Sequence, residues 1–159
     1  MTHTIAGLWL WGRGSIRLPR DGGIAFVVRD PYLPPGTLRA ALCYPRDADA
    51  YTTEDILGGL QRAGLERLSP SLDRVARWER EFGNDERRML SVVQLLLHRP
   101  GWIVIDDIGD LTDGDNGERV ASIFRDELAA AAIIAMGTGE GRVDLFARTL
   151  RLVPVTGDQ

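Results

Sequence analysis

Lysine is absent from the 159-residue chain, so all 19 of its basic residues are arginine. This absence excludes a Schiff-base enzyme and a phosphate-binding loop that carries its usual lysine. The single cysteine, Cys43, excludes a disulfide framework and a cysteine-rich zinc site. No apolar run reaches the roughly 18 residues that a membrane-spanning helix needs. The first residues lack the basic start and the cleavage site of a secretory signal peptide.

The composition that is present predicts one globular domain. Hydrophobic residues make up 44% of the chain, which suffices for a packed core. We expect residues 1–153 to form this domain and residues 154–159 to form a flexible tail. The net charge of -4 offers no general attraction to nucleic acid or to membrane lipid, so we expect no nucleic-acid partner.

Three continuous apolar runs alternate with helical patterns and predict an α/β fold, a parallel sheet with helices on both faces. The predicted buried strands are Ile24–Val28, Trp102–Ile105 and Ala131–Met136. The predicted helices are residues 1–11, Leu38–Leu42 after Thr37, a helix from Thr52 or Thr53 to Gly64, Glu86–His98, and Glu118–Leu128. Short strands are expected at Ser15–Leu18 and Leu150–Val153, a loop rich in Asp and Gly is expected after Asp107, and residues 66–82 fit no pattern.

Two adjacent carboxylates, Asp106 and Asp107, follow the middle strand directly. In open α/β sheets, ligands gather at the carboxyl ends of the strands. A pair of carboxylates there suits a hydrated Mg²⁺ ion, which takes one or two carboxylates together with phosphate oxygens. The same two residues also fit the start of a solvated loop, and the pattern leaves both interpretations open.

Three further features resemble sites but favour structural roles. The segment Phe82–Glu86 begins a helix, whose free N–H groups attract anions, yet its own carboxylates predict a self-capped helix that repels phosphate. The loop Gly137–Gly141 contains no basic residue and is typical of a turn. His3 and His98 lie far apart in the sequence, which disfavours a catalytic histidine.

A series of short motifs occurs in order from about residue 5 to residue 153. They are Ala6-Gly7-Leu8-Trp9, Arg29-Asp30-Pro31-Tyr32-Leu33-Pro34, Gly36-Thr37-Leu38-Arg39, Leu42-Tyr44-Pro45, Leu95-Leu96-Leu97-His98-Arg99-Pro100 and Trp102–Asp106. In this combination they resemble the ATP-binding domain of ABC transporters, in particular half-transporters of the SbmA/BacA and peroxisomal fatty-acyl types. The resemblance implies a partial P-loop NTPase-like sheet, with ATP and Mg²⁺ as cofactors.

The resemblance also assigns roles to individual positions, several of which depart from the family pattern. The Walker B aspartate, which holds Mg²⁺ through the nucleotide, is Asp106, and the catalytic glutamate position holds Asp107. The remaining positions implied by the resemblance are Arg29 for the Q-loop glutamine, Phe82, Gly83, Asn84, Asp85 and Glu86 for the signature, Asp110 to Asp113 for the D-loop, and Thr138 for the switch histidine. We expect the chain to lack the Walker A loop and the strands before it.

The departures predict a degenerate ABC-type domain fragment with little or no ATPase activity, whose ancestral role is to couple ATP to transmembrane transport. Its partners would be a transmembrane transporter domain or a second ABC ATP-binding domain, in the cytoplasm or at the cytoplasmic face of the inner membrane. The alternative is a non-catalytic interaction module that pairs with an intact ABC ATPase subunit. A receiver-like phosphoacceptor domain with Asp106 and Asp107 as its acidic pair is disfavoured, because it needs a lysine that the chain lacks.

Overall fold

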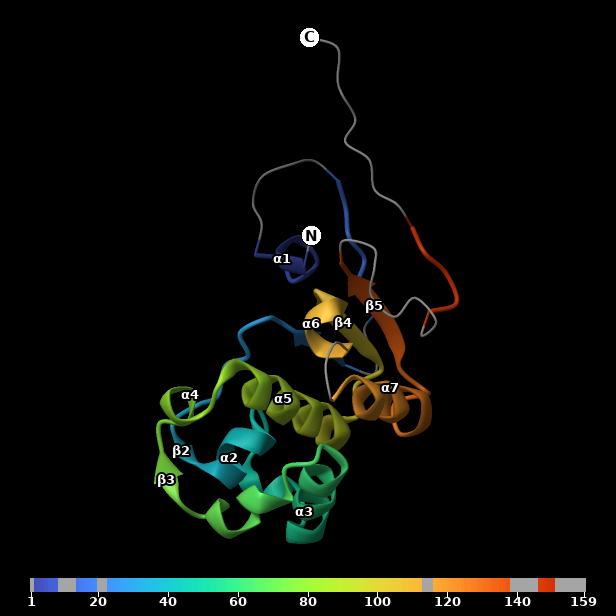
Figure 1. Cartoon of the computed structure of the whole chain (residues 1–159). Coiled ribbons are helices and arrows are strands. Elements are labelled where there is room, and N and C mark those ends of the chain that lie inside the picture. The colour runs from blue at the N-terminus through green and yellow to red at the C-terminus, as the bar shows by residue number, and fades with distance from the viewer. Residues whose placement is uncertain (1, 9–13, 20–22, 113–115, 138–145, 151–159) are drawn as a thin grey trace.

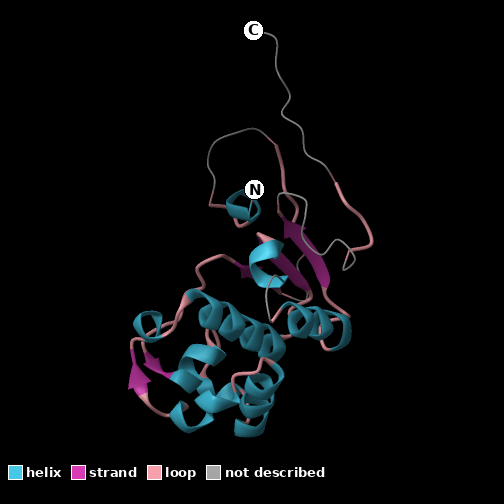
Figure 2. Ribbon diagram, viewed as in Figure 1, coloured by secondary structure: helices cyan, strands magenta, loops and turns pink. Residues whose placement is uncertain are grey.

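The computed structural model describes the chain except residues 1, 9–13, 20–22, 113–115, 138–145 and 151–159 (Figure 1). The described elements are α-helices, two short 3₁₀ helices and strands in two sheets (Figure 2). The helices are α1 Thr2–Ile5, α2 Leu38–Cys43, α3 Thr53–Arg62, α4 Trp78–Glu81, α5 Asn84–His98, α6 Ile108–Thr112 and α7 Gly117–Asp126. The 3₁₀ helices are η1 Ala48–Ala50 and η2 Glu66–Ser71, and the strands are β1 Ile24–Val27, β2 Gly36–Thr37, β3 Val75–Ala76, β4 Trp102–Asp106 and β5 Ala132–Met136.

The main sheet is parallel, with the strand order β1-β4-β5. Its register pairs Val27 of β1 with Ile105 of β4, and Asp106 of β4 with Met136 of β5. Because all three strands run in the same direction, their carboxyl ends meet at one edge of the sheet. The fold is therefore α/β, a parallel sheet with flanking helices, as the sequence predicts and as a partial P-loop ABC-type domain requires.

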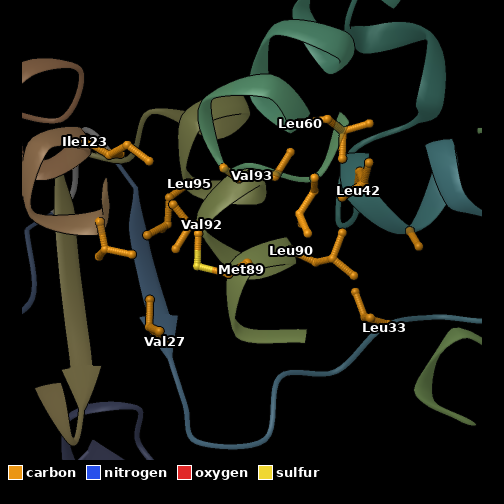
Figure 3. Close-up of a cluster of buried hydrophobic side chains, with 14 of the residues drawn as sticks. Val27, Leu33, Leu42, Leu60, Met89, Leu90, Val92, Val93, Leu95 and Ile123 are labelled. Carbon is orange, nitrogen blue, oxygen red and sulfur yellow. The ribbon is translucent and has the colours of Figure 1, made fainter. Parts of the chain in front are cut away.

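Helix α5 lies between the sheet and the other helices and forms part of the core with both (Figure 3). Val92 of α5 lies on the side of Val27 of β1, whereas Leu90 and Val93 lie toward the helical side (Figure 3). Gly59 allows α3 to approach closely, since a Cβ atom there would stand 3.0 Å from the side chain of Val93. The long apolar helix thus has two buried faces, one for each layer.

Local capping explains where the central helices begin and end. Thr37 caps α2 by accepting a hydrogen bond from the Ala40 N–H, as predicted. Thr52 and Asp55 form a capping box at the start of α3, with reciprocal side-chain to backbone bonds of 3.0 and 3.1 Å. Arg99 ends α5 in the left-handed conformation, at the predicted position.

The N-terminal predictions are wrong in two places. Helix α1 ends at Ile5, not near residue 11, because Gly7 has a φ of 75° and terminates it. The Leu8 N–H bonds the His3 carbonyl and the Gly7 N–H bonds the Thr4 carbonyl, which is the pattern of a glycine helix stop. Ser15–Leu18 forms no strand, since its side chains are exposed and no described strand pairs with it.

Other predictions need correction after the central strand. The expected loop after Asp107 contains α6, whose Ile108 and Leu111 side chains are buried on one helical face. The outer strands are less buried than their apolar sequences suggest: Phe26 of β1 is 36% exposed and Ile134 of β5 is 39% exposed. An outer strand has a neighbour on one side only within the described sheet, which leaves side chains at its margin open to water.

The remaining segments complete the comparison with the sequence. Residues 66–82, which fit no pattern, hold η2, β3 and α4. Leu150 belongs to no strand, and the rest of the strand predicted at Leu150–Val153 and the tail at 154–159 lie outside the described residues. Within the described parts of the chain, no helix combines the length and apolarity that crossing a bilayer requires.

Candidate functional site

The two adjacent carboxylates lie at the carboxyl edge of the sheet, where the sequence placed them. Asp106 is the last residue of β4, and Asp107 follows it with a φ of 65°. A non-glycine residue in this left-handed region is uncommon and turns the chain sharply. The turn brings the Asp107 carboxylate toward the end of β5, where a Cβ atom on Gly137 would lie 4.0 Å from its Oδ1 atom.

An arginine from the neighbouring strand neutralises the second of these carboxylates. The Arg29 guanidinium donates to Oδ2 of Asp107 at 2.8 Å, and the two side chains are 65% and 37% exposed. Arg29 follows β1, which lies beside β4 in the sheet. The parallel pairing of the two strands therefore brings together two residues that are 78 positions apart in the chain.

A shallow hollow surrounds this ion pair. Its surface is almost entirely apolar, and two arginines and two aspartates are among the residues around it. The lining residues are Val27, Val28, Arg29, Arg88, Ile105, Asp106, Asp107 and Leu111. Sequence reasoning missed Arg88, although its place one helical turn after Asp85 is a signal that it lies near the start of α5. The formal charges of the four ionisable side chains in this lining cancel.

The start of α5 closes on itself. Gly83 stands at the N-cap position, and its N–H donates to the Glu86 carboxylate at 3.3 Å, which is one half of a capping box because glycine has no side chain for the other half. Glu86 also pairs with Arg67, and Asp85 pairs with Arg88 at 3.1 Å. The first turn therefore carries negative charge, as predicted, and of the predicted capping oxygens Glu86 bonds the N-cap N–H.

The other residues of this segment make structural contacts. The Phe82 ring stacks on Trp78 with ring centroids 5.4 Å apart, and Arg74 lies over the Trp78 ring at 4.5 Å. Asn84 accepts a hydrogen bond from Arg87, which in turn forms an ion pair with Asp30 at 2.6 Å. These bonds fasten the start of α5 to the loop after β1.

The predicted residues therefore divide into two groups. The hollow brings Arg29, Asp106 and Asp107 together, whereas Phe82, Gly83, Asn84, Asp85 and Glu86 are not among its lining residues. Two further predicted site residues, Asp113 and Thr138, lie outside the described residues. The roles that the resemblance assigns to all of these residues stay predictions.

His98 forms two hydrogen bonds that join the end of α5 to the segment after α2. Its Nε2–H donates to the Tyr44 carbonyl at 2.8 Å, and Nδ1 accepts from the Tyr51 hydroxyl at 2.5 Å. The carbonyl can only accept, so this bond places a proton on Nε2, and in the neutral ring Nδ1 is then the acceptor for the Tyr51 hydroxyl. Burial lowers the pKa of His98 and favours this neutral form.

The cofactors implied by the resemblance can be tested against this geometry. Among the residues that the structure describes, no three His, Cys, Asp or Glu side chains converge on one metal position. Magnesium would need both carboxylates of the acidic pair or one with phosphate oxygens, but Asp107 already accepts a bond from Arg29. The self-capped, acidic start of α5 does not suit a phosphate group. With Asp107 engaged by Arg29, the acidic pair does not offer both of its carboxylates to Mg²⁺.

Comparison with known proteins identifies relatives over most of the chain. No protein-family model matches it. An uncharacterized ABC transporter ATP-binding protein of Haemophilus influenzae is 29% identical over 137 residues, which cover 86% of this chain and 23% of that protein. The inner membrane ABC transporter ATP-binding protein YddA of Escherichia coli is 24% identical over 84% of this chain and 23% of its own length. The human lysosomal cobalamin transporter ABCD4 is 29% identical over 67% of this chain and 20% of its own length.

The chain thus spans less than a quarter of the length of these relatives. The aligned part nevertheless covers most of the chain described above, including the parallel sheet that ends in Asp106 and Asp107. Over most of its length, therefore, the chain is similar to the ATP-binding proteins of ABC transporters.

Proposed function

We propose that the chain is a degenerate part of an ABC-type ATP-binding domain, with little or no ATPase activity of its own. The relatives support the ABC ATP-binding role, and β4 with Asp106 at its carboxyl end supports the site. The observation that carries the loss of activity is the self-capped start of α5. Its first turn holds the carboxylates of Asp85 and Glu86, and Asp85 is 87% exposed.

The physical reason lies in the electrostatics of the helix end. A helix N-terminus binds phosphate because its N–H groups are free and its dipole is positive there. Here the Gly83 N–H already donates to Glu86, and the carboxylates in the first turn offset the positive end of the dipole. An exposed Asp85 would also meet an approaching phosphate as a like charge. The segment that resembles the signature, Phe82–Glu86, therefore repels a nucleotide phosphate.

Asp107 supports the same conclusion, because it would have to position the attacking water. By resemblance it stands at the position of the catalytic glutamate, with a side chain one methylene shorter. That difference moves a carboxylate by about 1 Å, and a misplacement of this size costs about 10²-fold in rate. The Arg29 guanidinium further draws the Asp107 carboxylate into an ion pair. We propose that such a carboxylate orients an attacking water poorly.

The test is titration of the chain with a fluorescent ATP analogue in the presence of Mg²⁺. We expect no saturable binding at submillimolar concentrations, and phosphate release no faster than the background. Asp106→Ala is the matched control, because it removes the side chain proposed for Mg²⁺ and leaves α5 unchanged. A dissociation constant in the low micromolar range that Asp106→Ala abolishes would overturn the proposal.

We further propose that the chain acts beside a transmembrane transporter domain or a second ABC ATP-binding domain, at the cytoplasmic face of a membrane. The name of the Escherichia coli relative places that protein in the inner membrane, and the human relative is a lysosomal transporter. Both are more than four times as long as the part aligned with this chain. Co-purification of the tagged chain from solubilised membranes tests this proposal. Recovery of the chain without any membrane-protein partner would contradict it.

A further inference from the structure

The charges around the acidic pair point to a function for Arg29 that differs from nucleotide binding. We propose that the Arg29 guanidinium is a resident counter-ion of Asp107 that keeps divalent cations away from the carboxyl end of β4. This inference deepens the proposed function, on which it rests for the identity of the site. It concerns the cation alone, so it is tested without nucleotide.

The first support is the geometry of the ion pair. The Arg29–Asp107 bond measures 2.8 Å and joins the ends of two adjacent parallel strands. A metal ion bound by Asp107 would either displace the Arg29 guanidinium from the carboxylate or bind next to its positive charge. The left-handed backbone of Asp107 aims the carboxylate away from a regular continuation of β4 and into this contact.

The second support is the overall charge of the hollow. Two carboxylates alone would attract a dication, but Arg88 of α5 is a second arginine among the residues that line the same hollow. Arg88 is fixed there by its bond to Asp85. Beside Arg29, Asp30 is occupied by Arg87 at 2.6 Å. Asp30, next to Arg29 in the chain, and Asp85, at the start of α5, thus each have an arginine partner of their own.

The third support is electrostatic magnitude. At contact distance, a unit positive charge repels a dication with twice the energy of two unit charges, even in water. Removing the charge of Arg29 both ends this repulsion and releases the Asp107 carboxylate as a ligand. Because both side chains are partly exposed, solvent screens the effect. We expect a gain of about tenfold in divalent-cation affinity, which corresponds to about 1.4 kcal/mol.

The experiment is a titration of the chain with Mn²⁺ alone, followed by electron paramagnetic resonance of the free ion at low ionic strength. Arg29→Gln is expected to bind Mn²⁺ about tenfold more tightly than the unchanged chain. The double variant Arg29→Gln with Asp107→Asn is expected to lose this gain, because the released carboxylate is gone. Arg39→Gln is the matched control: it releases Asp73 from a similar ion pair at a different place and is expected to gain nothing.

Each outcome decides the proposal. Equal Mn²⁺ affinity of Arg29→Gln and the unchanged chain would overturn it, as would an equal gain in Arg39→Gln or a gain that survives Asp107→Asn. Arg29 is 65% exposed, so its substitution leaves the core intact, and circular dichroism of each variant verifies the fold. The nucleotide titration tests a different proposal. Tight nucleotide binding would refute the proposed function, whereas the Mn²⁺ titration alone tests the role of Arg29.

Discussion

The helices around α5 and the three-stranded sheet are both rich in apolar residues, yet they bury them to different extents. On the helical side, Leu42, Leu60 and Leu90 are fully buried. In the sheet, only β4 is buried along most of its length, whereas Phe26 and Ile134 on the outer strands are more than a third exposed. Within the described residues, the apolar side chains of the helical side are covered, whereas several of those on the outer strands are not.

The difference follows from the geometry of the two kinds of element. An amphipathic helix needs cover along one stripe, which two or three neighbouring helices can supply. A strand in a parallel sheet exposes two faces and two edges, so complete burial needs a neighbour on each side and a layer on each face. Within the part of the sheet that the structure describes, β4 has neighbours on both sides, and β1 and β5 each have one. Mutations should therefore affect the two regions unequally.

The largest expected effect is the loss of a core leucine on the helical side. Leu90→Ala should lower the free energy of unfolding by about 2–5 kcal/mol, because it leaves a cavity at a fully buried position. Ile134→Ala in β5 removes a similar volume from a position that is 39% exposed, and should cost about 1 kcal/mol or less. Urea denaturation of both variants measures the difference. Equal losses would show that the sheet is as tightly packed as the helices.

A smaller effect is expected where the chain turns from α6 into α7. A Cβ atom on Gly117 would lie 1.8 Å from the Thr112 carbonyl oxygen, so Gly117→Ala must displace backbone and should destabilise by about 1–3 kcal/mol. Gly58 in α3 has open space around it, and Gly58→Ala should stabilise by about 0.4–1 kcal/mol. Thermal unfolding measures both effects: the melting temperature should fall for Gly117→Ala and rise for Gly58→Ala. A neutral Gly117→Ala would refute the close approach of α6 and α7.

The smallest effect concerns the pH dependence of the helical side. Burial lowers the pKa of His98 below its ordinary value of about 6.5, so the unfolded chain takes up the proton first as the pH falls. The contribution of neutral His98 to stability is therefore complete above about pH 6.5 and is lost as the pH falls through the folded pKa. Urea midpoints at pH 7.5 and pH 5.5 should differ in the unchanged chain, and less in His98→Gln. An unaltered difference in His98→Gln would assign the pH dependence to other groups.

Much of the helical side could be predicted from local patterns. Thr37 and the Thr52–Asp55 pair cap helices at the predicted places, because the capping bonds join residues only three apart. The apolar run at Trp102–Ile105 likewise predicted the central strand and the position of the acidic pair at its end. The early stop of α1 at Gly7 is also a local signal, since glycine favours the left-handed helix end, but the prediction placed the stop at the later glycines.

The sequence by itself determined the types of the main elements, the caps of α2 and α3, and the presence of two carboxylates after the central strand. Only the tertiary structure decided that Arg29 meets Asp107, that Arg88 joins the same hollow, and that the outer strands stay partly exposed. Capping and periodicity act within one turn or a few residues, so they can be read along the chain. Contacts between the ends of β1 and β4 depend on which strands become neighbours, and that choice follows from packing the whole sheet against α5.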